Sequence, residues 1–164
     1  AAAEAISLLK KELPELMLGA GTVLTPEQLD AAEAAGASFI VSPGFNPRVV
    51  DYAIKRGIPI FPGINNPTGI EAALERALPA VKFFPAEASG GLKMLKAMAA
   101  PYGEIRFMPT GGINAQNIGS YLEFPRVIAC GGSWMVAADL IASENWSRVS
   151  ELAREALASA KGSP

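Results

Sequence analysis

The chain has 164 residues, half of them hydrophobic, and a formal net charge of -2 at pH 7. This length and composition suit one globular domain with a sizeable core, and the scattered Lys and Arg side chains form no basic face for nucleic acid or an acidic membrane surface. No apolar run approaches the length of a membrane span and no signal peptide opens the chain, so no membrane partner is expected.

Short apolar runs alternate with helical patterns along the chain. Including their Gly or Pro turns, the runs predict strands at residues 16–23, 38–44, 58–63, 80–84, 105–112 and 126–134. Helices are predicted at residues 1–13, 26–35, 48–56, 70–78, 92–100, 115–122, 137–142 and 146–161, followed by a tail at 162–164.

Six strands alternating with helices in units of about 20 to 25 residues, with no linker between them, predict a parallel α/β architecture with one core. The spacing fits a (β/α) barrel. A closed eight-stranded barrel needs at least about 200 residues, so about two units would be missing. A doubly wound open sheet, which needs no missing unit, is the alternative at this point.

Lys82 lies inside the apolar run 80–84, which Pro85 ends. Such a run is typical of a strand buried on both faces, so Lys82 would point into the interior. Poor solvation of its ammonium group would lower its pKa and supply neutral amine for Schiff-base formation. A lysine near a strand end that extends its amine to water is the alternative.

Two absences from the sequence, of histidine and of a suitable acidic cluster, favour chemistry based on lysine. The chain contains no histidine, which excludes Ser-His-Asp and Cys-His nucleophiles and every imidazole metal site. No acidic cluster has the spacing of an oxygen-ligand metal site, so no metal is expected.

The single cysteine, Cys130, excludes an internal disulfide and fits a reducing cytoplasm.

Glycine turns follow the last two predicted strands. Gly111-Gly112 and Gly131-Gly132-Ser133 lie where barrel enzymes bind phosphate through backbone N–H groups, and Ser133 could add a hydroxyl. The alternative is that these glycines only make tight turns. Glu87, five residues after Lys82, would either orient this pocket or cap the next helix.

Five motifs then occur in the order of a known family: GAGT at 19–22, VSPG at 41–44, KFFPAE at 82–87, PTGG at 109–112 and GGSW at 131–134. With these motifs the chain resembles the 2-keto-3-deoxy-6-phosphogluconate (KDPG) aldolases and the related 4-hydroxy-2-oxoglutarate (KHG) aldolases. The resemblance favours the (β/α)8 TIM barrel over the open sheet. It implies a single partial barrel domain over residues 1–161.

The resemblance implies a class I aldolase, a cytoplasmic lyase that cleaves its phosphorylated keto acid to pyruvate and glyceraldehyde 3-phosphate. KHG, which would yield pyruvate and glyoxylate, is a possible further substrate. Neither a metal nor another cofactor would be required, and the chain would form a homotrimer. Lys82 would carry the imine. Thr22, Pro43, Phe84 and Thr110 would contact the pyruvate side of the substrate, and Gly111, Gly112 and Ser133 would hold the phosphate.

The chain also departs from the family. Members begin with two further βα units, whose second strand carries a proton-shuttling glutamate and a carboxylate-binding arginine in a motif resembling E-[VI]-T-[LF]-R. Residues 1–164 lack that motif, and Glu4 and Glu12 do not match it. We expect carbinolamine dehydration and enamine protonation to slow by about 10² to 10⁴ without the shuttle. Two functions therefore stay open: an aldolase acting through Lys82, and a catalytically impaired fragment or assembly scaffold derived from one.

Overall fold

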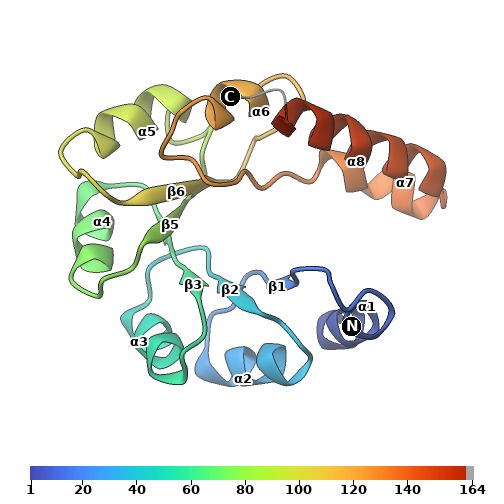
Figure 1. The fold of residues 1–164 in the computed structure, drawn as a ribbon, viewed down its shortest axis with the longest axis horizontal. Coiled ribbons are helices and arrows are strands. Elements are labelled where there is room, and N and C mark those ends of the chain that lie inside the picture. Colours follow the sequence, from blue (N-terminus) through green and yellow to red (C-terminus); the bar gives the residue numbers. More distant parts are fainter. Residues whose placement is uncertain (162–164) are drawn as a thin grey trace.

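The computed structural model describes residues 1–161, which form an arc of parallel strands with helices around it (Figure 1). The strands are β1 (Gly19–Ala20), β2 (Phe39–Val41), β3 (Ile60–Phe61), β4 (Gly63–Ile64), β5 (Ala80–Phe83) and β6 (Arg106–Pro109). The helices are α1 (Ala2–Glu12), α2 (Pro26–Ala34), α3 (Pro47–Arg56), α4 (Pro67–Leu74), α5 (Gly91–Ala99), α6 (Ile118–Leu122), the 3-10 helix η1 (Trp134–Val136), α7 (Ala138–Ala142) and α8 (Trp146–Lys161). The predicted tail at 162–164 lies outside the described residues. Within residues 1–161, no helix combines the length and the apolar character that crossing a membrane requires.

Three helices begin with a polar cap followed by proline. The side chains of Thr25, Asn46 and Asn66 each accept a hydrogen bond from a backbone N–H of the first turn of α2, α3 and α4. The start of α4 differs from the prediction of 70–78. Because Asn66 accepts from the N–H of Gly69 at 2.9 Å, the helix already begins at residue 67.

The strands form two parallel three-stranded sheets, ordered β1-β2-β3 and β4-β5-β6. Pro62 separates β3 from β4, since proline has no N–H to continue the ladder. The carbonyl of Pro62 still accepts a hydrogen bond from the N–H of Lys82 at 2.9 Å. Within each sheet the order follows the sequence, and α2 to α6 lie outside the arc (Figure 1). A doubly wound sheet would reverse its order and carry helices on both faces, so that alternative is not supported.

The strand predicted at 126–134 does not form. Only two isolated parallel bridges tie this segment to the sheet, between Phe107 and Val127 and between Thr110 and Gly131. The segment pairs on one side only, and its two adjacent glycines favour a regular strand least. The prediction of six strand–helix units is therefore not confirmed, because the last predicted strand is missing.

Alternate strand residues differ in burial. Those facing the helices, Ile40, Ile60, Val81, Phe83 and Phe107, are at most 5% exposed and form the core with the helices. Successive strand side chains point to opposite faces, so Phe39, Phe61 and Lys82 face the inner side of the arc. These three are half-buried. The lysine thus lies on the face that the helices do not cover.

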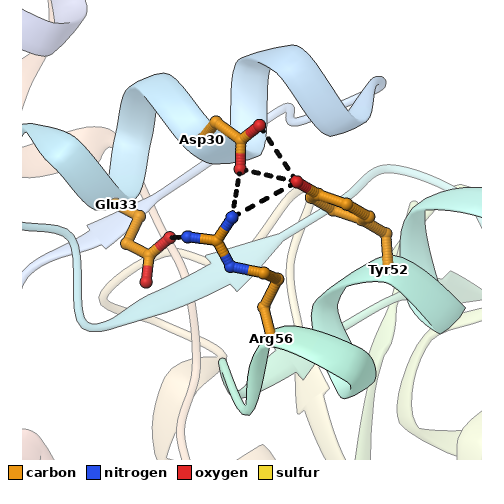
Figure 2. A network of polar contacts seen from close by, with 4 residues as sticks. All are labelled: Asp30, Glu33, Tyr52 and Arg56. Atoms are coloured by element: carbon orange, nitrogen blue, oxygen red, sulfur yellow. Dashed lines mark hydrogen bonds and ion pairs between the residues drawn. The ribbon is translucent and has the colours of Figure 1, made fainter.

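A polar network joins α2 to α3 on the surface (Figure 2). Arg56 of α3 pairs with Asp30 at 3.1 Å and with Glu33, both on α2. The Tyr52 hydroxyl donates to Asp30 at 2.9 Å and accepts from Arg56 at 3.3 Å. All four side chains come from two neighbouring helices, so the network stabilises their packing and lies apart from Lys82.

Candidate active site

Lys82 is held by the strand at the centre of its sheet. β5 pairs with β4 on one side and β6 on the other, with Lys82 opposite Gly63 and Met108. The Lys82 Nζ lies 4.3 Å from the centroid of the Phe84 ring. Burial of the side chain lowers the pKa of the Lys82 amine below its ordinary value. The side chain is half-buried, so it lies neither in the interior, as a strand buried on both faces would place it, nor freely in solvent. A larger share of neutral amine is available than on an exposed lysine.

A cavity of about 220 Å³ opens at the carboxyl ends of β5 and β6. Its lining consists of Lys82, Phe84, Thr110, Gly111, Gly112, Ile113, Gly131, Gly132 and Ser133. Six of the predicted site residues are therefore brought to one place. The hydroxyl oxygen of Thr110 is buried and finds no hydrogen-bond partner among the described residues. A buried polar atom of this kind is costly unless a ligand or water completes it, so Thr110 is suited to contact a bound molecule.

The Gly111-Gly112 turn presents free N–H groups to the cavity. Both residues have positive φ, 94° and 83°. The carbonyl of Gly111 accepts from the N–H of Glu87 at 3.0 Å, and that of Gly112 accepts from the Asn117 side chain at 3.0 Å. In a trans peptide the following N–H points the opposite way. The N–H groups of Gly112 and Ile113 have no acceptor among residues 1–161. Both residues line the cavity, so these donors are available to an anion bound there.

Two predicted residues do not line this cavity. Thr22 lines a separate cavity of about 280 Å³ together with residues of α1 and α2, and its φ of 59° is unusual for a β-branched residue. Pro43 packs its carbonyl against Gly63 and lines neither cavity. Both follow β1 and β2, which belong to the other sheet. Their role in substrate binding stays a prediction.

Sequence reasoning missed several supporting residues. Asn114 and Asn117 were not singled out, although their side chains hold the Gly112 carbonyl and cap each other's backbone. The N-x-x-N spacing directly after the glycine turn was the available signal, because Asn commonly bonds to backbone two or three residues away. Tyr121 was missed too. Its hydroxyl donates to Glu87 across 34 residues of sequence, a contact that no local pattern predicts.

Other groups offer less chemistry. Burial raises the pKa of the Cys130 thiol to about 11, so it is a poor nucleophile at neutral pH. Across residues 1–161, no three His, Cys, Asp or Glu side chains gather where they could hold a metal ion. A larger cavity of about 1020 Å³ is lined by Ala80, Arg106 and other residues at the amino-terminal ends of β5 and β6. Parallel α/β proteins bind ligands at the opposite end, where Lys82 lies.

The chain is similar to known proteins over nearly its whole length. The family model for KDPG and KHG aldolase matches residues 1–152. A 2-dehydro-3-deoxy-phosphogluconate aldolase of Haemophilus influenzae is 52% identical over 157 residues, which cover 96% of this chain and 74% of the relative.

Two solved structures extend the comparison. A Legionella pneumophila KDPG aldolase, with pyruvate captured as a covalent carbinolamine, superposes with a TM-score of 0.88 at 38% identity, covering 99% of this chain and 76% of the other. A Zymomonas mobilis KDPG aldolase with 3-phosphoglycerate gives a TM-score of 0.86 at 40% identity, covering 94% and 72%.

Proposed function

This chain belongs to the KDPG and KHG aldolase family, and from that membership we propose that it is a class I aldolase whose Lys82 forms an imine with a 2-keto acid. The substrate class is KDPG, with KHG as a further substrate. The observation that carries the proposal is the shared cavity. Lys82, whose amine has a lowered pKa, lines the same 220 Å³ space as Gly112 and Ile113, whose N–H groups are free.

In this reaction the neutral amine of Lys82 adds to the C2 carbonyl, and the resulting carbinolamine loses water to give an iminium ion. When the C3–C4 bond breaks, its electron pair moves toward the iminium nitrogen and the C4 hydroxyl loses its proton. Glyceraldehyde 3-phosphate leaves, C3 of the enamine is protonated, and water releases pyruvate and the free amine. The lysine accepts the electron pair, so the scheme calls for no metal.

The neighbours support each half of this scheme. The Legionella pneumophila protein holds pyruvate as a carbinolamine, which is the first covalent species on such a path. The Zymomonas mobilis protein binds 3-phosphoglycerate, a phosphorylated three-carbon acid. In this chain we assign the imine to Lys82, the pyruvate side to Thr22, Pro43, Phe84 and Thr110, and the phosphate to Gly111, Gly112 and Ser133.

The same membership leads us to propose that residues 1–161 are a single partial domain of a (β/α)8 barrel that works as a homotrimer in the cytoplasm. The sequential strand order and the helices on one side of the strands favour this arrangement. Sedimentation of the purified chain tests the trimer.

A second function also has an observation in its favour. The chain spans about three quarters of the length of its relatives. Residues 1–164 do not contain the E-[VI]-T-[LF]-R motif. The resemblance assigns the proton-shuttling glutamate and the carboxylate-binding arginine to that motif. These 164 residues alone could therefore form the imine yet turn over slowly, as an impaired fragment or scaffold.

Borohydride trapping tests the proposal. The chain is incubated with pyruvate and sodium borohydride, and the reduced adduct is located by intact mass and peptide mapping. We expect one adduct on Lys82 and none in Lys82→Met. The exposed Lys93 of α5 is the matched control, because Lys93→Met should leave trapping unchanged. Absence of an adduct on Lys82 would contradict the proposal.

Turnover then separates the two functions. The 164-residue chain is compared with the same chain preceded by the N-terminal segment of the Haemophilus influenzae relative. Turnover at least about 100-fold lower in the shorter chain, with trapping intact, identifies an impaired fragment. Comparable turnover in both identifies an enzyme that is active with these 164 residues alone.

A further inference from the structure

Glu87 connects the two loops that form the cavity. It follows β5, five residues after Lys82, and its N–H donates to the carbonyl of Gly111 in the loop after β6. Its carboxylate accepts a hydrogen bond from the hydroxyl of Tyr121 on α6. The sequence left open whether Glu87 caps the next helix. It does not, since Gly90 is the N-cap of α5 and no side chain caps that end.

Gly112 packs directly on the stem of Glu87. A Cβ atom on Gly112 would lie 2.6 Å from Cγ and 2.7 Å from Cβ of Glu87, closer than real Cβ contacts allow. The Glu87 side chain therefore occupies the space beside the turn. From the other side, the Asn117 side chain donates to the Gly112 carbonyl at 3.0 Å. The turn is held by these two contacts, and neither of them uses the N–H groups of Gly112 and Ile113.

Tyr121 makes the position of Glu87 definite. The tyrosine is 1% exposed and lies in the core, whereas Glu87 is exposed. Burial and the hydrogen bond to Glu87 raise the pKa of Tyr121, so the hydroxyl keeps its proton and donates. An exposed glutamate is free to adopt many rotamers, and a buried donor at one end restricts it to the rotamer that supports Gly112.

We propose that Glu87 and Tyr121 form a positioning pair that holds the Gly111-Gly112 turn in its anion-binding conformation and thereby sets the preference of the site for phosphorylated keto acids. This rests on the proposed function in assigning the ligand class. Neither residue lines the cavity, so the pair acts through the turn and not on the reacting atoms. Imine formation at Lys82 should be independent of it.

Tyr121→Phe tests the pair by removing one hydroxyl. The NMR amide shifts of Gly112 and Ile113 are followed while inorganic phosphate is added to the full chain. We expect saturable shifts in the parent and a dissociation constant about 5-fold higher in the variant, the equivalent of one lost hydrogen bond. Pyruvate trapping on Lys82 should be unchanged.

Two substitutions of Glu87 separate positioning from charge. Glu87→Gln keeps an oxygen acceptor for Tyr121 and the stem beside Gly112, and it removes a negative charge near the anion. We expect it to bind phosphate at least as tightly as the parent. Glu87→Ala removes both acceptor and stem and should weaken binding at least as much as Tyr121→Phe. A merely electrostatic role would make the alanine variant bind tighter.

The matched control is Tyr102→Phe. Tyr102 also donates to a glutamate, with its hydroxyl 2.9 Å from Glu71, but that pair is exposed and lies on α4 and the loop after α5. This control should leave phosphate binding unchanged. The proposed role of the pair is overturned if the NMR amide shifts of Gly112 and Ile113 in the parent do not saturate with phosphate. It is also overturned if Tyr121→Phe binds phosphate like the parent. Failure of the aldolase proposal shows instead as a missing pyruvate adduct on Lys82, whatever the phosphate titration gives.

Discussion

The amine of Lys82 lies over the ring of Phe84, with Nζ 4.3 Å from the ring centroid. Two effects shift the pKa of the amine in opposite directions. Burial favours the neutral nucleophile, whereas the negative face of an aromatic ring favours the ammonium ion. Burial lowers the pKa of Lys82, and the ring acts against that shift.

Phe84→Leu should therefore make Lys82 a neutral amine at lower pH. Leucine keeps the site apolar but removes the attraction of about 0.5–1 kcal/mol between ring and cation. The pH of half-maximal pyruvate trapping should fall by about 0.5, the equivalent of that energy. The measurement is trapping rate against pH. Phe124→Leu is the control, since that ring lies 5.7 Å from the Nζ of Lys96; an equal fall in both variants would contradict the argument.

Lys82→Met should abolish trapping without weakening the fold. Because the pKa of Lys82 is lower in the folded chain, the unfolded chain holds more protons between the folded and unfolded pKa values. Stability therefore rises with pH across that window, and the penalty is complete below it. At pH 7 the methionine variant should melt slightly higher, by about 2 °C, an effect kept small by solvent screening at a half-buried side chain.

Thermal melts at pH 7 and pH 10 measure that effect. The gap between Lys82→Met and the parent should narrow as the pH rises toward the ordinary lysine value. A gap that widens with pH would show that the amine is stabilised as a cation in the folded chain.

Gly112→Ala should destabilise the chain and abolish phosphate binding. The residue has φ of 83°, and an added Cβ would meet the Glu87 side chain. The expected loss is about 1–3 kcal/mol, measured by urea unfolding. Gly119→Ala is the matched control. Gly119 lies in α6 with no atom within 4 Å of an added Cβ, so alanine there should stabilise by up to about 1 kcal/mol.

Arg56→Met should lower the melting temperature slightly, by about 1–3 °C at low salt, since it removes the pairs with Asp30 and Glu33 and the contact with Tyr52 (Figure 2). The loss should shrink in 1 M salt, because screening weakens exposed ion pairs. Arg48→Met is the control: within residues 1–161 the Arg48 side chain pairs only with Glu27, at 3.6 Å, so this variant should change the melting temperature least. Equal losses at both positions, independent of salt, would show that lost packing alone matters.

The sequence by itself determined what depends on neighbours in the chain. The caps Thr25 and Asn46, the alternation of strands and helices, and the apolar run around Lys82 are local signals. They were sufficient to predict a parallel α/β fold. They also predicted a strand buried on both faces, whereas Lys82 lies half-buried on the inner face of the arc. The Gly111-Gly112 turn was visible for the same reason, since its positive φ angles select glycine locally.

The tertiary structure alone decided which of these parts meet. Whether residues 126–134 pair as a strand depends on partners on both sides, and only two bridges form. Thr22 follows β1 of one sheet and Lys82 lies in β5 of the other, and the two sheets are separated at Pro62. The hydrogen bond between Tyr121 and Glu87 joins residues 34 positions apart. Contacts of this kind follow from how the helices and loops pack in three dimensions, and no spacing in the sequence encodes them.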